Sequence, residues 1–164
     1  DVDFEQHAKD IYDEPQWPKE PLFYANFPSL TDKTAAPEGM ESGFFLVPLA
    51  PGIEDTEELR DQYFDKIIER FEILTQQTVK SNIVFKQSFC KNDFVSEYNS
   101  YKGNAYGMAN TLLQTAFLRP KLKSSKVKNL YFTGQLTVPG PGVPPALISG
   151  KLVSELIDKQ LFKS

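Results

Sequence analysis

The chain has 164 residues, of which 40% are hydrophobic and 13% aromatic, and its formal net charge is −4. This length supports one domain with a hydrophobic core, and the aromatic content argues against disorder. The acidic balance argues against nucleic acid as the main partner, because phosphate binding favours a basic surface.

Two residue types that often carry chemistry occur once each, as Cys90 and His7. A single cysteine excludes an intramolecular disulfide and fits a reducing compartment. Without a neighbouring histidine, Cys90 is more often a buried apolar residue than a nucleophile. His7 stands among charged residues, so we expect it to be exposed to solvent. Because no second ligand accompanies it, the sequence predicts no metal site.

The start of the chain and its apolar segments show whether the sequence resembles a signal peptide or a membrane-spanning helix. No apolar run approaches the roughly 20 residues that a helix needs to span a bilayer. Asp1, Asp3 and Glu5 make the start acidic, unlike the basic start of a signal peptide, and there is no initiating methionine. We therefore expect an excised piece of a longer protein.

The first 50 residues predict one short helix and two strands. The spacing of apolar residues favours a helix end over residues 1–12. Three prolines exclude regular structure from residues 13–21. Residues 22–27 (LFYANF) and 43–49 (GFFLVPL) predict strands, and a loop over residues 31–39 connects them.

A long helix over residues 55–77 is the clearest predicted element. Asp55 is a candidate N-cap and Glu58 follows three residues later, which is the spacing of a capping box. Apolar residues then fall on one helical face, at Leu59, Tyr63, Phe64, Ile67, Ile68, Phe71 and Leu74. Residues 82–89 (NIVFKQSF) predict a strand, and a short helix is expected over residues 91–98.

The second half of the chain differs from the first in its sequence pattern, and we expect two lobes to meet near residue 100. A short strand over residues 130–133, a turn rich in glycine and proline, and a final helix over residues 144–161 end the chain. Together the elements predict an α+β fold. Residues 119–129 form a basic loop, for which solvation is favoured over contact with anionic lipid headgroups. Its cations are Arg119, Lys121, Lys123, Lys126 and Lys128.

The segment 129–157 (NLYFTGQLTVPGPGVPPALISGKLVSELI) carries the most specific pattern. A hydrophobic strand stops at Gly134, a rigid bend follows, and proline opens a helix, where its missing N–H would be unpaired in any case. The start of a helix presents free backbone donors and the positive end of its dipole. It therefore suits an anion, or an oxygen that gains negative charge during a reaction. Ser149 and Gly150 are small enough to allow close packing against the helix.

This segment resembles the C-terminal signature of bacterial-type phytoene desaturases. There a strand ends in a glycine-containing turn, a Pro-Gly-x-Gly-[Ile/Val]-Pro segment follows, and a helix contains Ser-Gly or Ser-Ala. The matching residues here are Asn129-Leu130-Tyr131, Gly134, Pro139-Gly140-Pro141-Gly142-Val143-Pro144 and Ser149-Gly150. Upstream, the matching stretches are residues 24–28, Thr31-Asp32, residues 36–39, residues 103–107, residues 114–117 and Arg119-Pro120. The resemblance covers nearly the whole chain, but Pro145 stands where glycine is common and Val138 where histidine is often found.

The resemblance implies a portion of a two-lobed FAD-dependent oxidoreductase of the amine-oxidase-like type. Residues 1–100 would be part of the substrate-binding lobe, a sheet with the long helix. Residues 101–164 would form the C-terminal return, a strand–turn–helix, into the FAD-binding lobe. No GxGxxG motif occurs in the 164 residues, so the dinucleotide-binding half is expected elsewhere. The fragment alone is not expected to bind FAD tightly or to turn over.

The resemblance also implies positions that contact FAD. Gly134 and Gln135 would approach its ribityl or pyrophosphate region. Gly142, Val143 and Pro144 would lie at the helix start beside N1 and the C2 carbonyl of the flavin, where negative charge accumulates on reduction. A helix terminus would favour that charge by about 0.3–2 kcal/mol.

Tyr106, Gly107 and Phe117 are the implied substrate-binding residues, near the junction of the lobes. Aromatic residues of the two predicted strands are open to two interpretations, as the lining of a channel for a long polyene or as ordinary core. Core packing is favoured for any one of them. These residues are Phe23, Tyr24, Phe27, Phe44 and Phe45.

The implied activity of the full-length protein is the removal of hydrogen from a C–C single bond of phytoene or a related polyene precursor, with hydride transfer to FAD. Isomerases, saturases and oxygenases of carotenoids belong to the same family, and a non-catalytic lipid- or partner-binding domain is the rival from another class. The apolar substrate implies a cytoplasmic protein in peripheral contact with the inner face of the membrane. No residue is predicted as a catalytic acid or base, and no oligomeric state is predicted.

Overall fold

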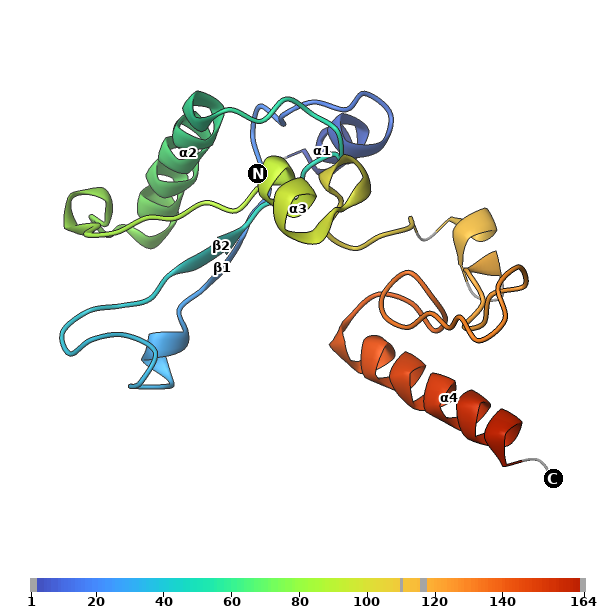
Figure 1. Cartoon of the computed structure of the whole chain (residues 1–164). Helices are drawn as coiled ribbons and strands as arrows, with labels where there is room; N and C mark the ends of the chain where they lie inside the picture. Colours follow the sequence, from blue (N-terminus) through green and yellow to red (C-terminus); the bar gives the residue numbers. More distant parts are fainter. Residues whose placement is uncertain (1–2, 110, 116–117, 163–164) are drawn as a thin grey trace. The chain divides into compact units, whose positions relative to one another are not determined.

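The computed structural model describes residues 3–109, 111–115 and 118–162. It separates into two compact units, Asp1–Asn104 and Ala105–Ser164 (Figure 1). Helices occur together with a small antiparallel sheet, which confirms the predicted α+β class. Within the described ranges, no helix combines the length and the apolar character needed to cross a membrane.

The first unit contains three α-helices and two strands among its described residues. In chain order they are α1 (Phe4–Tyr12), β1 (Tyr24–Asn26), β2 (Phe44–Leu46), α2 (Glu57–Thr75) and α3 (Lys91–Tyr98). Single 3₁₀ turns lie between them, at Pro28–Leu30, Lys80–Asn82 and Tyr101–Gly103. The helices predicted near the start of the chain and over residues 91–98 are confirmed.

Helix α1 turns His7 inward, so the prediction that His7 is exposed is wrong. His7 is only 5% exposed, and its Nδ1 accepts the backbone N–H of Leu22 at 3.2 Å. Asp10 is buried as well, and its Oδ1 accepts the side-chain amides of Gln6 at 2.9 Å and Gln16 at 2.8 Å. The helical face on which a residue lies decides its burial: Glu5 and Lys9 lie on exposed faces, whereas Asp10, three residues after His7, shares its buried face.

Strands β1 and β2 pair antiparallel, with Tyr24 opposite Leu46, and each is three residues long. They confirm the two predicted strands over shorter spans. Beside them, the rings of Phe27, Phe45 and Phe71 lie with their centroids 5.3 to 5.9 Å apart. This cluster supports the core interpretation for Phe27 and Phe45, since Phe71 belongs to α2.

The N-cap of α2 is Thr56, so the prediction that Asp55 caps this helix is wrong. Thr56 has extended backbone angles, and its Oγ1 accepts the N–H of Leu59 at 3.3 Å. Asp55 forms two short contacts with Arg60, at 2.6 and 2.8 Å, and accepts the N–H of Asn92 at 2.7 Å. The Asp55 carboxylate therefore joins α2 to α3 instead of closing the start of α2.

Two predicted strands do not form among the described residues. Residues 83–89 follow the 3₁₀ turn without entering a ladder, and residues 130–133 contribute only an isolated antiparallel bridge between Tyr131 and Lys123. A strand forms only where a partner pairs its backbone N–H and C=O groups. The alternation of residues indicates an extended segment, but it does not supply that partner.

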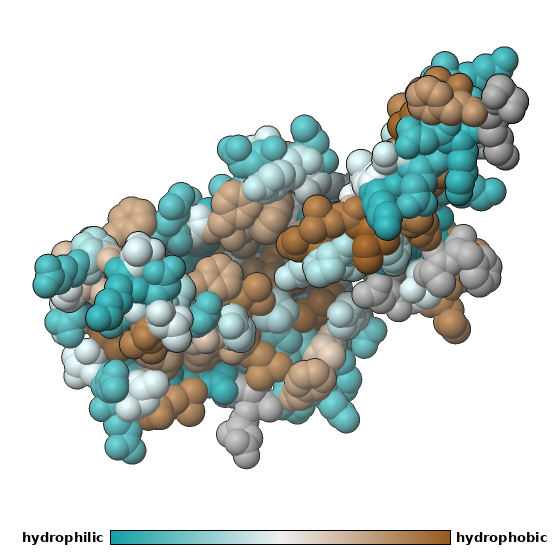
Figure 2. All heavy atoms as spheres, turned by 90° about the horizontal axis from the view of Figure 1, so that it is seen from below, coloured by the Kyte–Doolittle hydropathy of each residue, from teal (hydrophilic) through white to brown (hydrophobic). Residues whose placement is uncertain are grey.

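The second unit is built around α4 (Val143–Leu161), which confirms the predicted last helix. A 3₁₀ turn at Leu112–Gln114 and long loops precede it. Buried residues of this unit include Arg119, Leu122, Thr137 and Ser149. Many apolar side chains of the chain stay exposed, and Figure 2 shows hydrophobic residues reaching the surface among the hydrophilic ones.

Candidate functional site

The turn before α4 owes its shape to glycine. Gly134 has φ +102° and Gly142, the residue before the helix, has φ +112°, a region that residues with side chains rarely adopt. A Cβ added at Gly134 would meet no atom within 4 Å, so the backbone there is open to close approach by another molecule. A Cβ at Gly142 would lie 3.4 Å from Cδ of Pro145.

A buried hydroxyl ties this turn to the helix. Ser149 is fully buried, and its Oγ accepts the backbone N–H of Gly134 at 2.8 Å. It donates to the carbonyl of Ala146 at 2.6 Å and lies 2.7 Å from Oγ1 of Thr133. Since the one Ser149 proton goes to Ala146, the Thr133 hydroxyl is the donor in the last contact. Ser149 is conspicuous in the sequence for its small size, whereas its hydrogen bonds are what position Gly134.

A buried guanidinium supports the other side of the turn. Arg119 is only 3% exposed, and its Nη1 donates to the carbonyl oxygen of Gln135 at 3.3 Å. A Cβ on Gly140 would lie 3.4 Å from Nε of Arg119. The prediction of a solvated basic loop is therefore wrong for Arg119, although the four lysines of that loop are exposed. The composition of the loop gave no signal that one of its cations turns inward.

Of the first three residues of α4, only Val143 offers a backbone donor. Pro144 and Pro145 have no N–H, and the N–H of Ala146 already bonds to the carbonyl of Gly142 at 2.9 Å. The N–H of Val143 has no partner among the described residues, and Val143 is 75% exposed. No acidic residue lies in the first turn of this helix. Such a helix start suits an electronegative oxygen of a bound group.

Of the predicted substrate residues, Gly107 lies beside this turn. Its φ is +81°, and a Cβ there would come 2.4 Å from Cδ2 of Leu136 and 4.0 Å from Cγ of Gln135. The structure thus brings Gly107 close to Gln135, one of the predicted cofactor-binding residues. Tyr106 is 64% exposed, and Phe117 lies outside the described residues.

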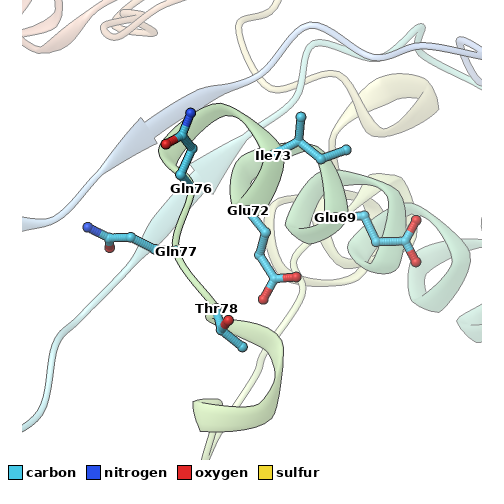
Figure 3. Close-up of a pocket in the computed structure, with 6 residues that line it drawn as sticks. All are labelled: Glu69, Glu72, Ile73, Gln76, Gln77 and Thr78. Atoms are coloured by element: carbon cyan, nitrogen blue, oxygen red, sulfur yellow. The ribbon is translucent and has the colours of Figure 1, made fainter.

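A surface hollow lies elsewhere, at the C-terminal end of α2. Its volume is about 450 Å³ and its lining consists of Glu69, Glu72, Ile73, Gln76, Gln77 and Thr78 (Figure 3). Glu72 accepts the backbone N–H groups of Lys80 at 2.7 Å and Val79 at 2.5 Å, and these bonds hold the pKa of its carboxyl below the usual value. We interpret the hollow as the open side of a helix end, because none of the predicted site residues lines it.

Metal and thiol chemistry find no support in the part of the chain that the structure describes. There, no group of three or more His, Cys, Asp and Glu residues is placed to hold a metal ion. Cys90 is half-buried, and this burial raises the pKa of its thiol. A raised pKa reduces the thiolate fraction and hence the reactivity, in agreement with a structural cysteine.

Comparison with known proteins adds relatives that match almost the whole chain. A carotenoid 3,4-desaturase of Haloarcula japonica is 44% identical over 156 residues, which make up 95% of this chain and 32% of that protein. A 4,4'-diapophytoene desaturase (4,4'-diaponeurosporene-forming) of Staphylococcus aureus strain Newman is 36% identical over 163 residues, covering 94% of this chain and 32% of that protein. No protein-family model matches. The chain is thus similar in sequence to carotenoid desaturases over nearly its whole length, and it spans about a third of the length of the curated relatives that it matches.

Proposed function

We propose that this chain is the C-terminal part of an FAD-dependent carotenoid desaturase. The full-length enzyme removes hydrogen from a C–C single bond of phytoene or a related polyene precursor. The names of the relatives support desaturation over isomerisation, saturation or oxygenation, since both named proteins are desaturases. When bound, the flavin supplies the acceptor for the hydrogen that leaves the substrate.

The open start of α4 is the observation that carries this proposal. The unpaired N–H of Val143 is the donor for an electronegative oxygen of the flavin, beside Gly142 and Pro144. Gly134, where an added Cβ would meet no atom within 4 Å, and the neighbouring Gln135 lie along the ribityl or pyrophosphate part. In this arrangement the chain orients the cofactor, and none of its residues acts as an acid or base.

The remaining assignments follow from the same proposal. Residues 1–100 contribute to the substrate-binding lobe and residues 101–164 return to the FAD-binding lobe. Tyr106, Gly107 and Phe117 contact the substrate. The protein lies in the cytoplasm and meets the inner face of the membrane peripherally, where an apolar polyene resides.

The test uses a chimera, because the chain spans only a third of its relatives. In it, this chain replaces the matching stretch of the Haloarcula japonica carotenoid 3,4-desaturase. We compare Gly142→Asp with Gly142→Ala, since both side chains meet the same strained φ of +112° and only one adds negative charge. The aspartate variant is expected to bind flavin roughly 2- to 30-fold more weakly than the alanine variant, the range of a charge at a helix terminus.

Visible absorbance of the purified chimeras measures the flavin content, and pigment extracted from a polyene-producing host measures desaturation. Equal flavin retention in the two variants would place the cofactor contact elsewhere. If the chimera without substitutions lacks flavin and leaves the polyene unchanged while the relative is active, the desaturase proposal fails. A non-catalytic binding domain is the hypothesis that this result would favour.

A further inference from the structure

Residues 83–89 form an extended segment whose backbone is unpaired, except at Ile83, among the described residues. Ile83 bonds weakly back to Lys80 at 3.4 Å, and α3 begins at Lys91. From residue 84 to residue 89, no backbone N–H or C=O has a hydrogen-bond partner among the described residues. In Figure 1 the segment runs from the end of the 3₁₀ turn to α3 without a bend back on itself.

Side chains alone fix this segment along α2. Lys86 Nζ lies 2.5 Å from Oδ1 of Asp61 and 4.7 Å from the centroid of the Phe64 ring. Nη1 of Arg60 contacts Oγ of Ser88 at 3.3 Å. As the segment advances, its partners move toward the start of α2, so the two run antiparallel. The segment is therefore held in place with its hydrogen-bonding groups still available.

The same segment exposes apolar side chains that a strand normally buries. Val84 is 80% exposed and Phe85 is 76% exposed. Both fit a strand by intrinsic preference, since β-branched and aromatic residues favour a pleated, half-buried surface. An exposed strand with free backbone groups is a template for pairing with another strand.

The sheet of the first unit has only two strands among the described residues. Strands β1 and β2 have three residues each and, among the described residues, pair with each other and with no third strand. A sheet of two strands is marginally stable in water and normally gains further strands or a covering layer. The relatives that match this chain are about three times as long, since the chain spans 32% of each.

We propose that residues 83–89 pair, in the full-length protein, with a β-strand from the part of the desaturase polypeptide outside these 164 residues. The occupant is a strand and not a helix, because only a strand satisfies a row of unpaired N–H and C=O groups. The inference rests on the proposed desaturase parent. Its test measures backbone protection and not flavin or product, so its failure is distinguishable from failure of the function.

Hydrogen exchange followed by mass spectrometry is the measurement, on the isolated chain, the chimera and the Haloarcula japonica relative. In the isolated chain, amides 84–89 are expected to exchange at rates close to those of an unstructured peptide. In the chimera, and in the aligned stretch of the relative, they are expected to exchange at least 100-fold more slowly. Fast exchange in the relative overturns the proposal even if the chimera fails to fold.

Two neighbouring proline variants test pairing through the backbone. Adjacent N–H groups of a strand point to opposite sides, so only one of Val84→Pro and Phe85→Pro removes a donor to the new partner. One variant of the chimera is expected to lose protection over the segment and the other to keep it; equal effects overturn the proposal. Glu38→Pro is the control, because Gly39 follows with φ +77° and proline suits the position before it in a turn.

The isolated chain, measured at several protein concentrations, tests whether the pairing strand comes from a second copy. If its amides 84–89 become protected as the protein concentration rises, the occupant is a second copy of this chain and the proposal is overturned. Exchange that stays fast at every concentration supports a strand from the rest of the polypeptide.

Discussion

Replacing Ser149 by alanine removes the hydroxyl that joins the turn to α4. Three contacts end at this oxygen, from Gly134, from Thr133 and to Ala146. Because Ser149 is fully buried, no solvent takes the place of the hydroxyl without a change in structure. The substitution therefore leaves the Gly134 N–H without its acceptor, at the position where we place the ribityl side of the cofactor.

The magnitude follows from these contacts. An unsatisfied backbone donor costs about 1–3 kcal/mol, and loss of the Thr133 bond costs about 0.5–1.5 kcal/mol, toward the low end because Thr133 is exposed to water. Alanine recovers roughly 0.5 kcal/mol through its higher helix propensity. The expected net loss for the second unit is about 1–3 kcal/mol, a factor of roughly 5 to 150 in its unfolding equilibrium.

Glycine labelled with ¹⁵N provides the assay, since the chain has nine glycines and two of them, Gly134 and Gly150, flank the contact. Urea titration followed at Gly150 reports the stability of α4, and amide exchange at Gly134 reports the bond itself. Ser154→Ala is the matched control, because Ser154 is an exposed residue of the same helix. This substitution changes the stability only through the higher helix propensity of alanine. The reasoning is refuted if Ser149→Ala is as stable as Ser154→Ala and the Gly134 amide is unchanged.

Two further predictions concern charge and backbone conformation. Hydrogen bonds from Arg60 hold the pKa of Asp55 below its usual value, so its stabilising effect is present above about pH 4 and is lost as the pH falls through the lower folded-state pKa. Tryptophan fluorescence should show the unfolding free energy of the first unit falling below about pH 4, and Asp55→Asn should remove that part of the acid dependence; an unchanged profile would contradict the pairing. Gly107→Ala and Gly39→Ala should each lower the free energy of unfolding by about 1–2 kcal/mol, because both glycines have a positive φ. Only Gly107→Ala should shift the methyl resonances of Leu136, because a Cβ at Gly39 meets no atom within 4 Å. Identical methyl spectra in the two variants would exclude the predicted contact.

Periodicity predicted the helices well because a helix satisfies its backbone within its own sequence. The last helix, predicted over residues 144–161, differs by one residue at its start, and α2 lies within its predicted span of 55–77. The strand prediction over residues 82–89 failed for the opposite reason, since a strand depends on a partner that its own sequence does not contain. Strands β1 and β2 form because they find each other.

The candidate site shows the same division between local and distant information. The glycine and proline pattern predicted a bend that leads into a helix, and the backbone of Gly134 and Gly142 adopts the positive φ that favours glycine. Burial of Arg119 against that bend was not predictable, because the other cations of its loop are exposed lysines. The role of Ser149 could be predicted only in part, because the sequence shows the size of the residue but not that its oxygen accepts the N–H of Gly134.

The hydrogen bonds that hold the turn come from buried side chains and not from groups that would contact a ligand. Because Pro144 and Pro145 have no N–H, Val143 is the only one of the first three residues of α4 that can donate a backbone hydrogen bond to a ligand. A single donor contributes little affinity, at most about 2 kcal/mol with the helix dipole, so its value lies in direction. Direction is kept by the buried side chains of Ser149 and Arg119, which hold the backbone of the turn by hydrogen bonds. Loss of either support should therefore disturb how a flavin is oriented before it disturbs whether a flavin binds.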